Sequence, residues 1–166
     1  EDFLISLSYG RGPVRVAGTS VFMCGSLGRT PVALLHNLKH NKVLHERVVF
    51  LTLVTDDVPY VVRDEQVVLE KLGEGVFRIT GHYGFMQEPD VPQLLRRARA
   101  LRDFSCGADE ATFFLGRETI VPSKQRGMAL WREHLFAFLV KIAQPPSGYF
   151  KLPENRVVEL GMRVRI

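Results

Sequence analysis

The stretch VRVAGTSVFMC-GSLGRT-PVALLHNLKH, followed by ERVVFLTLVT, decides the fold of this chain (residues 14–40 and 46–55). Its first part, residues 14–24, is rich in Val and Phe and ends at Gly25, which favours a β-strand. The apolar run from Val48 to Val54 predicts a second strand, buried on both faces. A helix between two such strands makes a βαβ unit, whose strands are parallel.

The helix between these strands carries signals at both of its ends. Thr30 is a candidate N-cap, and Pro31 follows at the first helical position, where its missing N–H costs nothing. Asn41 is a candidate C-cap in a left-handed conformation. One flank of the helix is expected to be apolar and the other polar. The apolar residues are Val32, Leu34, Leu35 and Leu38, and the polar ones are Asn37, Lys39 and Asn41.

The middle of the chain predicts a hairpin and a further helix. QVVLEKL (66–72) and VFRITGHY (76–83) flank the turn-forming Gly73-Glu74-Gly75. Asp90 and Gln93 have the spacing of a capping box, with Pro92 inside the first turn. The helix that follows is expected to bury Val91, Leu94, Leu95, Ala98 and Leu101, and to expose Arg96, Arg97, Arg99 and Arg102.

The last third of the chain predicts strands around a long helix. ATFFLGRETIVP (111–122) is typical of two short strands around Gly116-Arg117, and a helix is expected over 128–143. The helix has a broad apolar stripe, which predicts burial against the sheet and against a partner subunit. The candidate interface residues are Trp131, Leu135, Phe138, Leu139 and Ile142. Alternating apolar residues from Val158 to Ile166 predict a half-buried strand, near a sheet edge or in an antiparallel pair.

Composition places the chain among ordinary globular domains. Its 166 residues are 46% hydrophobic and 24% charged, which suits one domain with a single core. No apolar run approaches the roughly 18 residues of a spanning helix, and residues 1–10 lack the pattern of a signal peptide. We therefore expect a soluble α/β fold: a single domain with a mixed β-sheet, an N-terminal βαβ unit, a central hairpin, packed helices and a C-terminal strand. The domain is expected to cover residues 13–166, after a linker segment at 1–12.

Charge narrows the range of partners. Lys and Arg total 22 and Asp and Glu total 18, so the net charge is 22 − 18 = +4. This excess is too small for a dedicated nucleic-acid binder, and no nucleic-acid partner is expected. It suits an anionic ligand or the lipid headgroups of an inner membrane leaflet.

The loop GSLGRT (25–30) is the candidate ligand site. It joins a strand to a helix, where backbone N–H groups and the helix dipole can hold a phosphate. It has neither the Lys-Ser/Thr ending of a P-loop nor the GxGxxG spacing, and the alternative is a tight turn before a capped helix. The candidate ligand-binding residues are Gly25, Ser26, Gly28, Arg29 and Thr30, together with the basic residues Lys39 and Lys42.

The sequence offers no complete catalytic set. His36 and His40 have the spacing of a zinc pair, but Asn37 stands where a zinc protease motif has its Glu. A polar helix end is the alternative for the two histidines. No serine lies in a GxSxG elbow, and Cys24 and Cys106 have no metal-type spacing. We expect no enzyme activity, no metal and no cofactor.

Five blocks of the sequence resemble the C-terminal tail of Kup (HAK/KUP/KT) potassium uptake transporters. The blocks are PVALLHNLKHNKVLHERVVFLTLVT (31–55), ITGHYGFMQEPDVPQLL (79–95), FFLGRETIVP (113–122), MALWREHLFAFL (128–139) and LPENRVVELGMRVRI (152–166). They occur in the family's order and extend over nearly the whole chain. DFLISL at 2–7 is similar to the segment that joins the last membrane helix to the tail.

The resemblance implies a cytoplasmic domain of a plasma (inner) membrane protein that takes up potassium together with protons. The ion sites of that family lie in its membrane part. The implied partners are the transmembrane portion of the same permease and a second copy of this domain, and the implied role is dimerisation and control of transport.

Three hypotheses follow. The first is a regulatory and dimerisation domain of a potassium:proton symport permease. The second is an adenine-nucleotide sensing domain that uses the 25–30 loop, since the resemblance implies cyclic di-AMP as a regulator of some relatives. The third is a stand-alone metal-dependent hydrolase with His36 and His40 as ligands.

Overall fold

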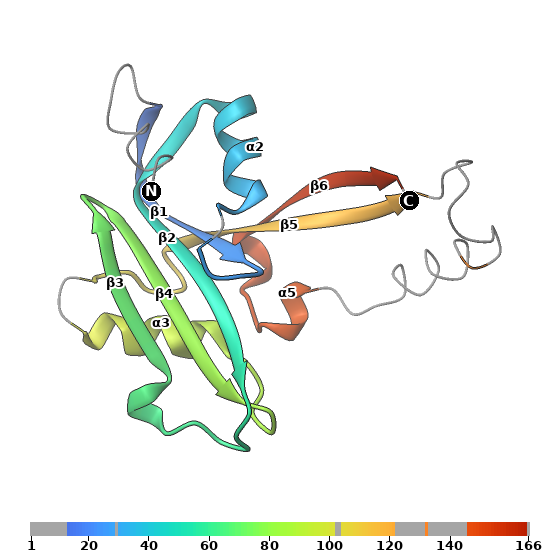
Figure 1. Cartoon of the computed structure of the whole chain (residues 1–166). Coiled ribbons are helices and arrows are strands. Elements are labelled where there is room, and N and C mark those ends of the chain that lie inside the picture. The colour runs from blue at the N-terminus through green and yellow to red at the C-terminus, as the bar shows by residue number, and fades with distance from the viewer. Residues whose placement is uncertain (1–12, 29, 102–103, 122–131, 133–145, 166) are drawn as a thin grey trace.

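The computed structural model describes residues 13–28, 30–101, 104–121, 132 and 146–165. Its described strands form one sheet in the order β3-β4-β2-β1-β5-β6 (Figure 1). The pair β3–β4 is antiparallel, and the four other neighbouring pairs are parallel. The strands are β1 (Val14–Cys24), β2 (Val43–Asp56), β3 (Val67–Gly73), β4 (Val76–Gly84), β5 (Ala111–Val121) and β6 (Val157–Arg165). The predicted α/β fold with a mixed sheet is confirmed.

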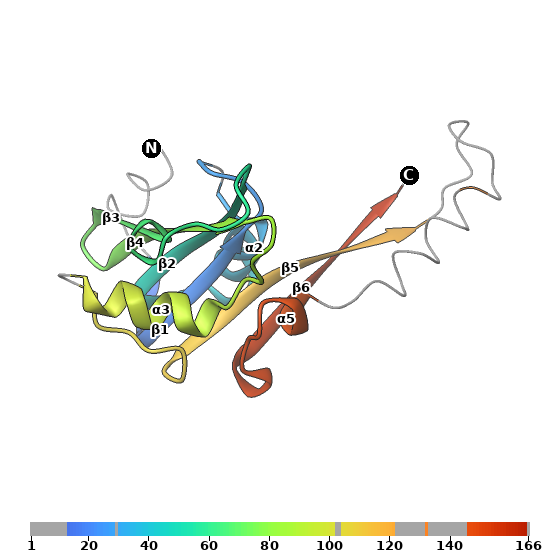
Figure 2. The same ribbon diagram turned by 90° about the horizontal axis from the view of Figure 1, so that it is seen from below.

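Three helices and two short 3-10 turns complete the described chain. They are α2 (Val32–Asn41), α3 (Val91–Ala100), α5 (Pro146–Tyr149), η1 (Arg63–Glu65) and η2 (Glu154–Arg156). Two buried clusters lie on opposite faces of the sheet, one under α2 and one under α3. Figure 2 shows α3 lying along one face of the strands. Within the described residues no helix is both long and apolar enough to cross a membrane.

The predicted βαβ unit is present as β1, α2 and β2, with the two strands in parallel register. Successive β1 side chains lie on opposite faces of the sheet. Val21 belongs to the cluster under α3, and Phe22 belongs to the cluster under α2. Phe22 stacks on Phe114 of β5 with ring centroids 4.8 Å apart. This alternation lets one central strand hold both cores together.

The predicted ends of α2 are wrong by one residue each. Pro31, not Thr30, is the N-cap, and it makes no side-chain cap hydrogen bond. The left-handed C-cap is Lys42 with φ +56°, not Asn41. The backbone conformation marks both boundaries: Pro31 is extended, with φ −65° and ψ 135°, and Lys42 is left-handed.

Burial on α2 also differs from the predicted flanks. Asn37 is only 2% exposed, since its amide donates to the Val43 carbonyl at 3.0 Å and its oxygen accepts from Asn41 at 2.8 Å. A buried amide with both groups bonded stabilises the connection from α2 to β2. Val32 and Leu35, expected inside, are exposed.

The hairpin β3–β4 is confirmed, and the geometry of its turn requires a glycine at position 75. Gly75 has φ +70°, and a Cβ there would lie 2.3 Å from the Glu46 carbonyl oxygen. A residue other than glycine would therefore require the backbone to move.

At the start of α3, half of the predicted capping box forms. The Asp90 carboxylate accepts from the Gln93 N–H at 2.8 Å, but the Gln93 side chain accepts from Arg97 instead of closing the box. The predicted buried face of α3 is confirmed for Val91, Leu94, Leu95 and Ala98. Leu101 is exposed, because the helix ends at Ala100.

The last two strands form an arm that leaves the body of the sheet (Figures 1 and 2). The prediction of two short strands at 111–122 is wrong, because β6 pairs with β5 without a break from Phe113 to Val121, across Gly116. β6 lies at the sheet edge, as expected, and it runs parallel to β5. The expected helix at 128–143, with Trp131, Leu135, Phe138, Leu139 and Ile142, and the segment 1–12 lie outside the described residues.

Neighbouring leucines of α2 provide a test of this packing. Leu34 is 0% exposed and Leu35 is 43% exposed. We expect Leu34→Ala to lower the free energy of unfolding by about 2–5 kcal/mol, because it leaves a cavity under α2. Leu35→Ala, the matched control, should cost about 1 kcal/mol or less. Urea unfolding followed by circular dichroism measures both, and equal losses would contradict the assignment of the α2 core face.

Candidate functional site

The strand order places the candidate loop at a reversal point of the sheet. From β1 the chain builds β2 and β4 on one side, and later β5 and β6 on the other. In open α/β sheets, ligands bind outside the carboxyl ends of the strands at the position where the order reverses. The loop Gly25–Thr30 follows the carboxyl end of β1 and therefore lies at this position.

The loop offers an open backbone surface beside the start of α2. Gly25, Ser26 and Gly28 are exposed, Thr30 is half-buried, and Arg29 lies outside the described residues. The first N–H groups of an α-helix have no partner within the helix, and the positive end of its dipole lies there. The first turn of α2 contains no acidic residue that would repel an anion. Chemically, this arrangement suits a phosphate group.

The structure does not bring all seven candidate residues together. Gly25, Ser26, Gly28 and Thr30 share the loop at the start of α2. Lys39 lies in the last turn of α2 and Lys42 is its C-cap, so about ten residues of helix, roughly 15 Å, separate them from the loop. At that end of α2, their positive charges interact favourably with the negative end of the helix dipole.

Burial disfavours the thiolate form of Cys24, the thiol that directly precedes the loop. Cys24 ends β1, and burial raises the pKa of its thiol to about 11, against smaller lowering effects from Thr52 and Arg78. Burial also raises the pKa of the Cys106 thiol. The thiolate is the reactive form, so burial lowers the reactivity of both side chains.

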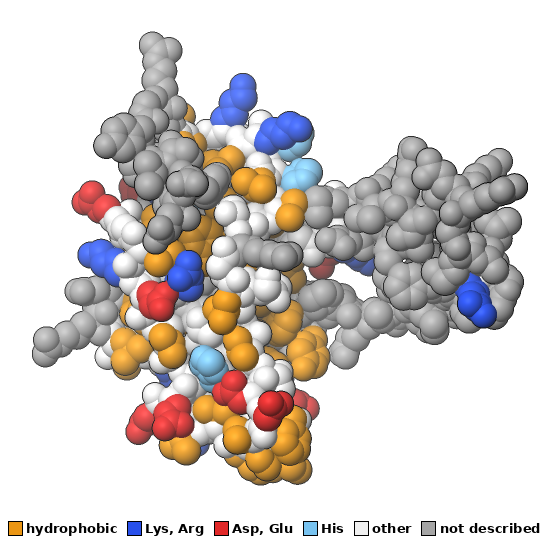
Figure 3. Space-filling view, in the orientation of Figure 1, with side chains coloured by type: hydrophobic (Ala, Val, Ile, Leu, Met, Phe, Trp, Pro, Cys, Tyr) orange, Lys and Arg blue, Asp and Glu red, His pale blue; other side chains and the backbone are white. Residues whose placement is uncertain are grey.

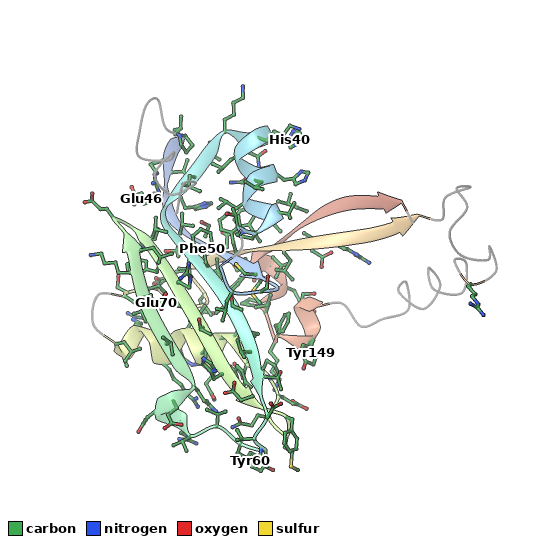
Figure 4. The ribbon with its side chains drawn as sticks, viewed as in Figure 1. His40, Glu46, Phe50, Tyr60, Glu70 and Tyr149 are labelled. Carbon is green, nitrogen blue, oxygen red and sulfur yellow. The ribbon has the colours of Figure 1, made fainter. Side chains whose placement is uncertain are left out.

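His36 and His40 stack on each other, with ring centroids 5.7 Å apart. In the part of the chain that the structure describes, no three His, Cys, Asp or Glu side chains gather closely enough to hold a metal ion. Figure 4 shows His40 near the end of α2, on the outside of the molecule. The pair is thus a surface feature of the helix end.

Sequence reasoning missed one pair of titratable side chains. Nδ1 of His82 on β4 lies 3.1 and 3.2 Å from the two carboxylate oxygens of Asp56 at the end of β2. The two residues are 26 positions apart in the sequence. In the parallel register of β2 and β4, His82 lies opposite Val54 and Asp56 lies opposite Gly84, so the two side chains are two positions apart on the same face of the sheet. Only this register brings them together.

Two glycines of the loop give a matched test of its backbone. Gly28 has φ +78°, and Gly25 does not have a positive φ; a Cβ at either would meet nothing within 4 Å. We expect Gly28→Ala to lower the free energy of unfolding by about 1 kcal/mol, because an L-residue is strained in the left-handed region. Gly25→Ala should leave it unchanged or raise it by up to about 1 kcal/mol. Thermal unfolding of both variants is the measurement, and equal changes would contradict the loop conformation.

Comparison with known proteins gives one family. Residues 17–166 match the family model described as "K+ potassium transporter C-terminal domain". The chain is 49% identical over 154 residues to the "Probable potassium transport system protein Kup" of Myxococcus xanthus, covering 93% of this chain and 23% of that protein. It is 51% identical over 153 residues to a Kup 1 protein of Paramagnetospirillum magneticum, covering 92% of this chain and 24% of the relative. No solved structure matches.

A third relative matches the chain over its whole length. The Kup protein of Cupriavidus metallidurans is 49% identical over all 166 residues, which are 26% of its own length. The chain therefore spans about a quarter of the curated relatives that it matches. The order of β1, α2, β2, the hairpin, α3, β5 and β6 falls almost entirely within the matched residues. With the family model matching all but the first 16 residues, this chain belongs to the family of potassium transporter C-terminal domains.

Proposed function

We propose that this chain is the regulatory and dimerisation domain of a Kup-type potassium:proton symport permease, attached on the cytoplasmic side to the transmembrane portion of the same protein. The relatives are named as potassium transport proteins, and this chain covers only about a quarter of their length. A role in assembly is supported chiefly by one observation, the arm made by β5 and β6.

Among the described residues, the outer part of the arm has only two strands. β1 pairs with β5 only from Thr19 to Phe22, so from Leu115 to Val121 the described strand next to β5 is β6 alone. A two-stranded ribbon is marginal in water, and parallel strands are normally covered on both faces. Where β1 no longer pairs with β5, the edge of β5 also presents backbone N–H and C=O groups that can pair with another strand. A second copy of the domain supplies both the covering face and the pairing strand.

Apolar side chains near the root of the arm support the same conclusion. α2 contacts β5, and Leu160 of β6 packs against the cluster under α2. Leu27 before α2, Val32 and Leu35 on α2, and Val158 of β6 are exposed. Burying these side chains against a second copy adds to the free energy of association in proportion to the apolar area covered.

Cross-linking tests the dimer at a defined place. Gly161 on β6 and Gly73 on β3 lie at opposite edges of the sheet, and a Cβ at either meets nothing within 4 Å. With a short bifunctional thiol reagent, we expect Gly161→Cys to give a covalent dimer on denaturing gels and Gly73→Cys to stay monomeric. The raised pKa values of the Cys24 and Cys106 thiols keep the background low in the unsubstituted chain. Cross-links at Gly73→Cys alone, or at neither site, would contradict the proposed dimer.

Nucleotide sensing is a second candidate, favoured by the position of the Gly25–Thr30 loop at the reversal point of the sheet. In this role the loop and the first turn of α2 bind the phosphates of an adenine nucleotide, and binding changes the activity of the permease. The open surface over Gly25, Ser26 and Gly28 leaves room for a phosphate to approach the backbone closely.

Titration calorimetry with AMP, ATP and cyclic di-AMP tests this candidate. For a nucleotide that binds, Ser26→Glu should weaken affinity by about tenfold or more, because the new carboxylate repels phosphate. Asn155→Glu, on the exposed turn η2, adds the same charge elsewhere and should leave affinity unchanged. No heat and no thermal shift with all three nucleotides removes the candidate, since a ligand of the native state raises the melting temperature.

A further inference from the structure

Two loops at the carboxyl ends of β2 and β4 form an exposed apolar patch, which we define by Val58, Tyr60, Val62, Phe85 and Met86. Tyr60, Val62, Phe85 and Met86 are 61–65% exposed, and Val58 is exposed as well. Figure 3 shows hydrophobic side chains gathered at this end of the molecule with acidic ones around them. Aromatic residues and Met are enriched in the centres of protein interfaces, and contiguous apolar patches mark sites of interaction.

The patch is held in place by hydrogen bonds between the two loops. The Phe85 N–H donates to the Val58 carbonyl at 2.9 Å, and the Met86 N–H donates to the Pro59 carbonyl at 3.2 Å. The Gln87 side-chain oxygen accepts from the N–H groups of Val61 at 2.9 Å and Gly84 at 2.7 Å. A preformed surface of this kind loses little conformational entropy when a partner binds.

A pocket of about 520 Å³ opens beside the patch. Its walls are the valines Val58, Val61, Val62 and Val68, and the carboxylates of Asp56 and Glu65 also line it. Tyr60, labelled at this end of the molecule in Figure 4, and His82 complete the lining. Apolar walls with carboxylates at the lining suit a Lys or Arg side chain, which combines an apolar stem with a charged head.

Charge at this end is opposite to that of the whole chain. Residues 56–65 and 84–90 contain six carboxylates against one arginine, Arg63, whereas the chain carries a net +4. The six carboxylates belong to Asp56, Asp57, Asp64, Glu65, Glu88 and Asp90. His82 pairs with Asp56, and Lys151 pairs with Glu88 at 3.2 Å. An apolar centre with an acidic rim is complementary to a segment that is both basic and apolar.

We propose that this end of the domain docks onto a Lys/Arg-rich cytoplasmic loop of the membrane part of the same permease, with one basic side chain inserted in the valine-walled pocket. The proposal rests on the proposed function, which places the domain on the cytoplasmic side. Membrane proteins concentrate Lys and Arg in their short cytoplasmic loops. About three quarters of the length of the relatives lies outside this chain, so the partner can be part of the same molecule.

Photo-cross-linking in the full-length permease identifies the occupant. With benzoylphenylalanine in place of Tyr60, we expect a cross-link to a Lys/Arg-containing segment outside this chain, located by mass spectrometry. Tyr149 is the matched control, because it is also an exposed tyrosine and lies on α5, and the same replacement there should give no such cross-link. Cross-linking of position 60 only to lipid, only to a second copy of this domain, or to nothing overturns the proposal.

Charge reversal tests the acidic rim in the same permease. Asp57→Lys together with Glu65→Lys should lower the yield of the Tyr60 cross-link by about tenfold. Asp109→Lys together with Glu110→Lys makes the same charge change at exposed residues before the amino end of β5 and should leave the yield unchanged. Equal losses from both pairs would also overturn the proposal. The Gly161→Cys dimer, measured in parallel, separates the two ideas: a dimer without the Tyr60 cross-link removes docking and leaves the proposed function.

Discussion

The structure depends on β1, the strand that is hydrogen-bonded to β2 on one side and to β5 on the other. A parallel strand in the middle of a sheet has both faces buried, so its alternate side chains must be apolar in both directions. Val21 and Phe22 meet this demand from adjacent positions, and both are completely buried. α2 and α3 are then placed on opposite faces because each core needs a cover.

The parts of the fold that follow from periodicity could be predicted from the sequence. The run Val48–Val54 indicated a buried strand, and the Gly73-Glu74-Gly75 turn indicated the hairpin. Features set by long-range pairing could not. Gly116 was expected to interrupt a strand, but β6 pairs with β5 across it. The sequence near Gly116 does not indicate that β6 is its pairing strand. Asn37 was expected on a polar flank, but it is buried, and its amide donates to the Val43 carbonyl.

The candidate sites show the same division. A strand–loop–helix pattern was enough to single out Gly25–Thr30, because the chemistry of that junction is local. Proximity along the sequence was a poor guide to the basic residues, since a helix between them and the loop carries Lys39 and Lys42 to its far end. The Asp56–His82 pair depends on the neighbouring positions of β2 and β4, which only the strand order supplies.

The pairing of β1 with β5 has a consequence for synthesis of the chain. Thr19 is in register with Ala111, which follows it by 111 − 19 = 92 residues. On the ribosome, β1 can pair with β2 as soon as residues up to about 52 have emerged, while its other edge waits for β5. During that interval a nascent chain displays one open edge of its central strand, and non-local contacts of this kind form slowly. The β1–β5 pairing can therefore form only after β5 has been synthesised, later than the β1–β2 pairing.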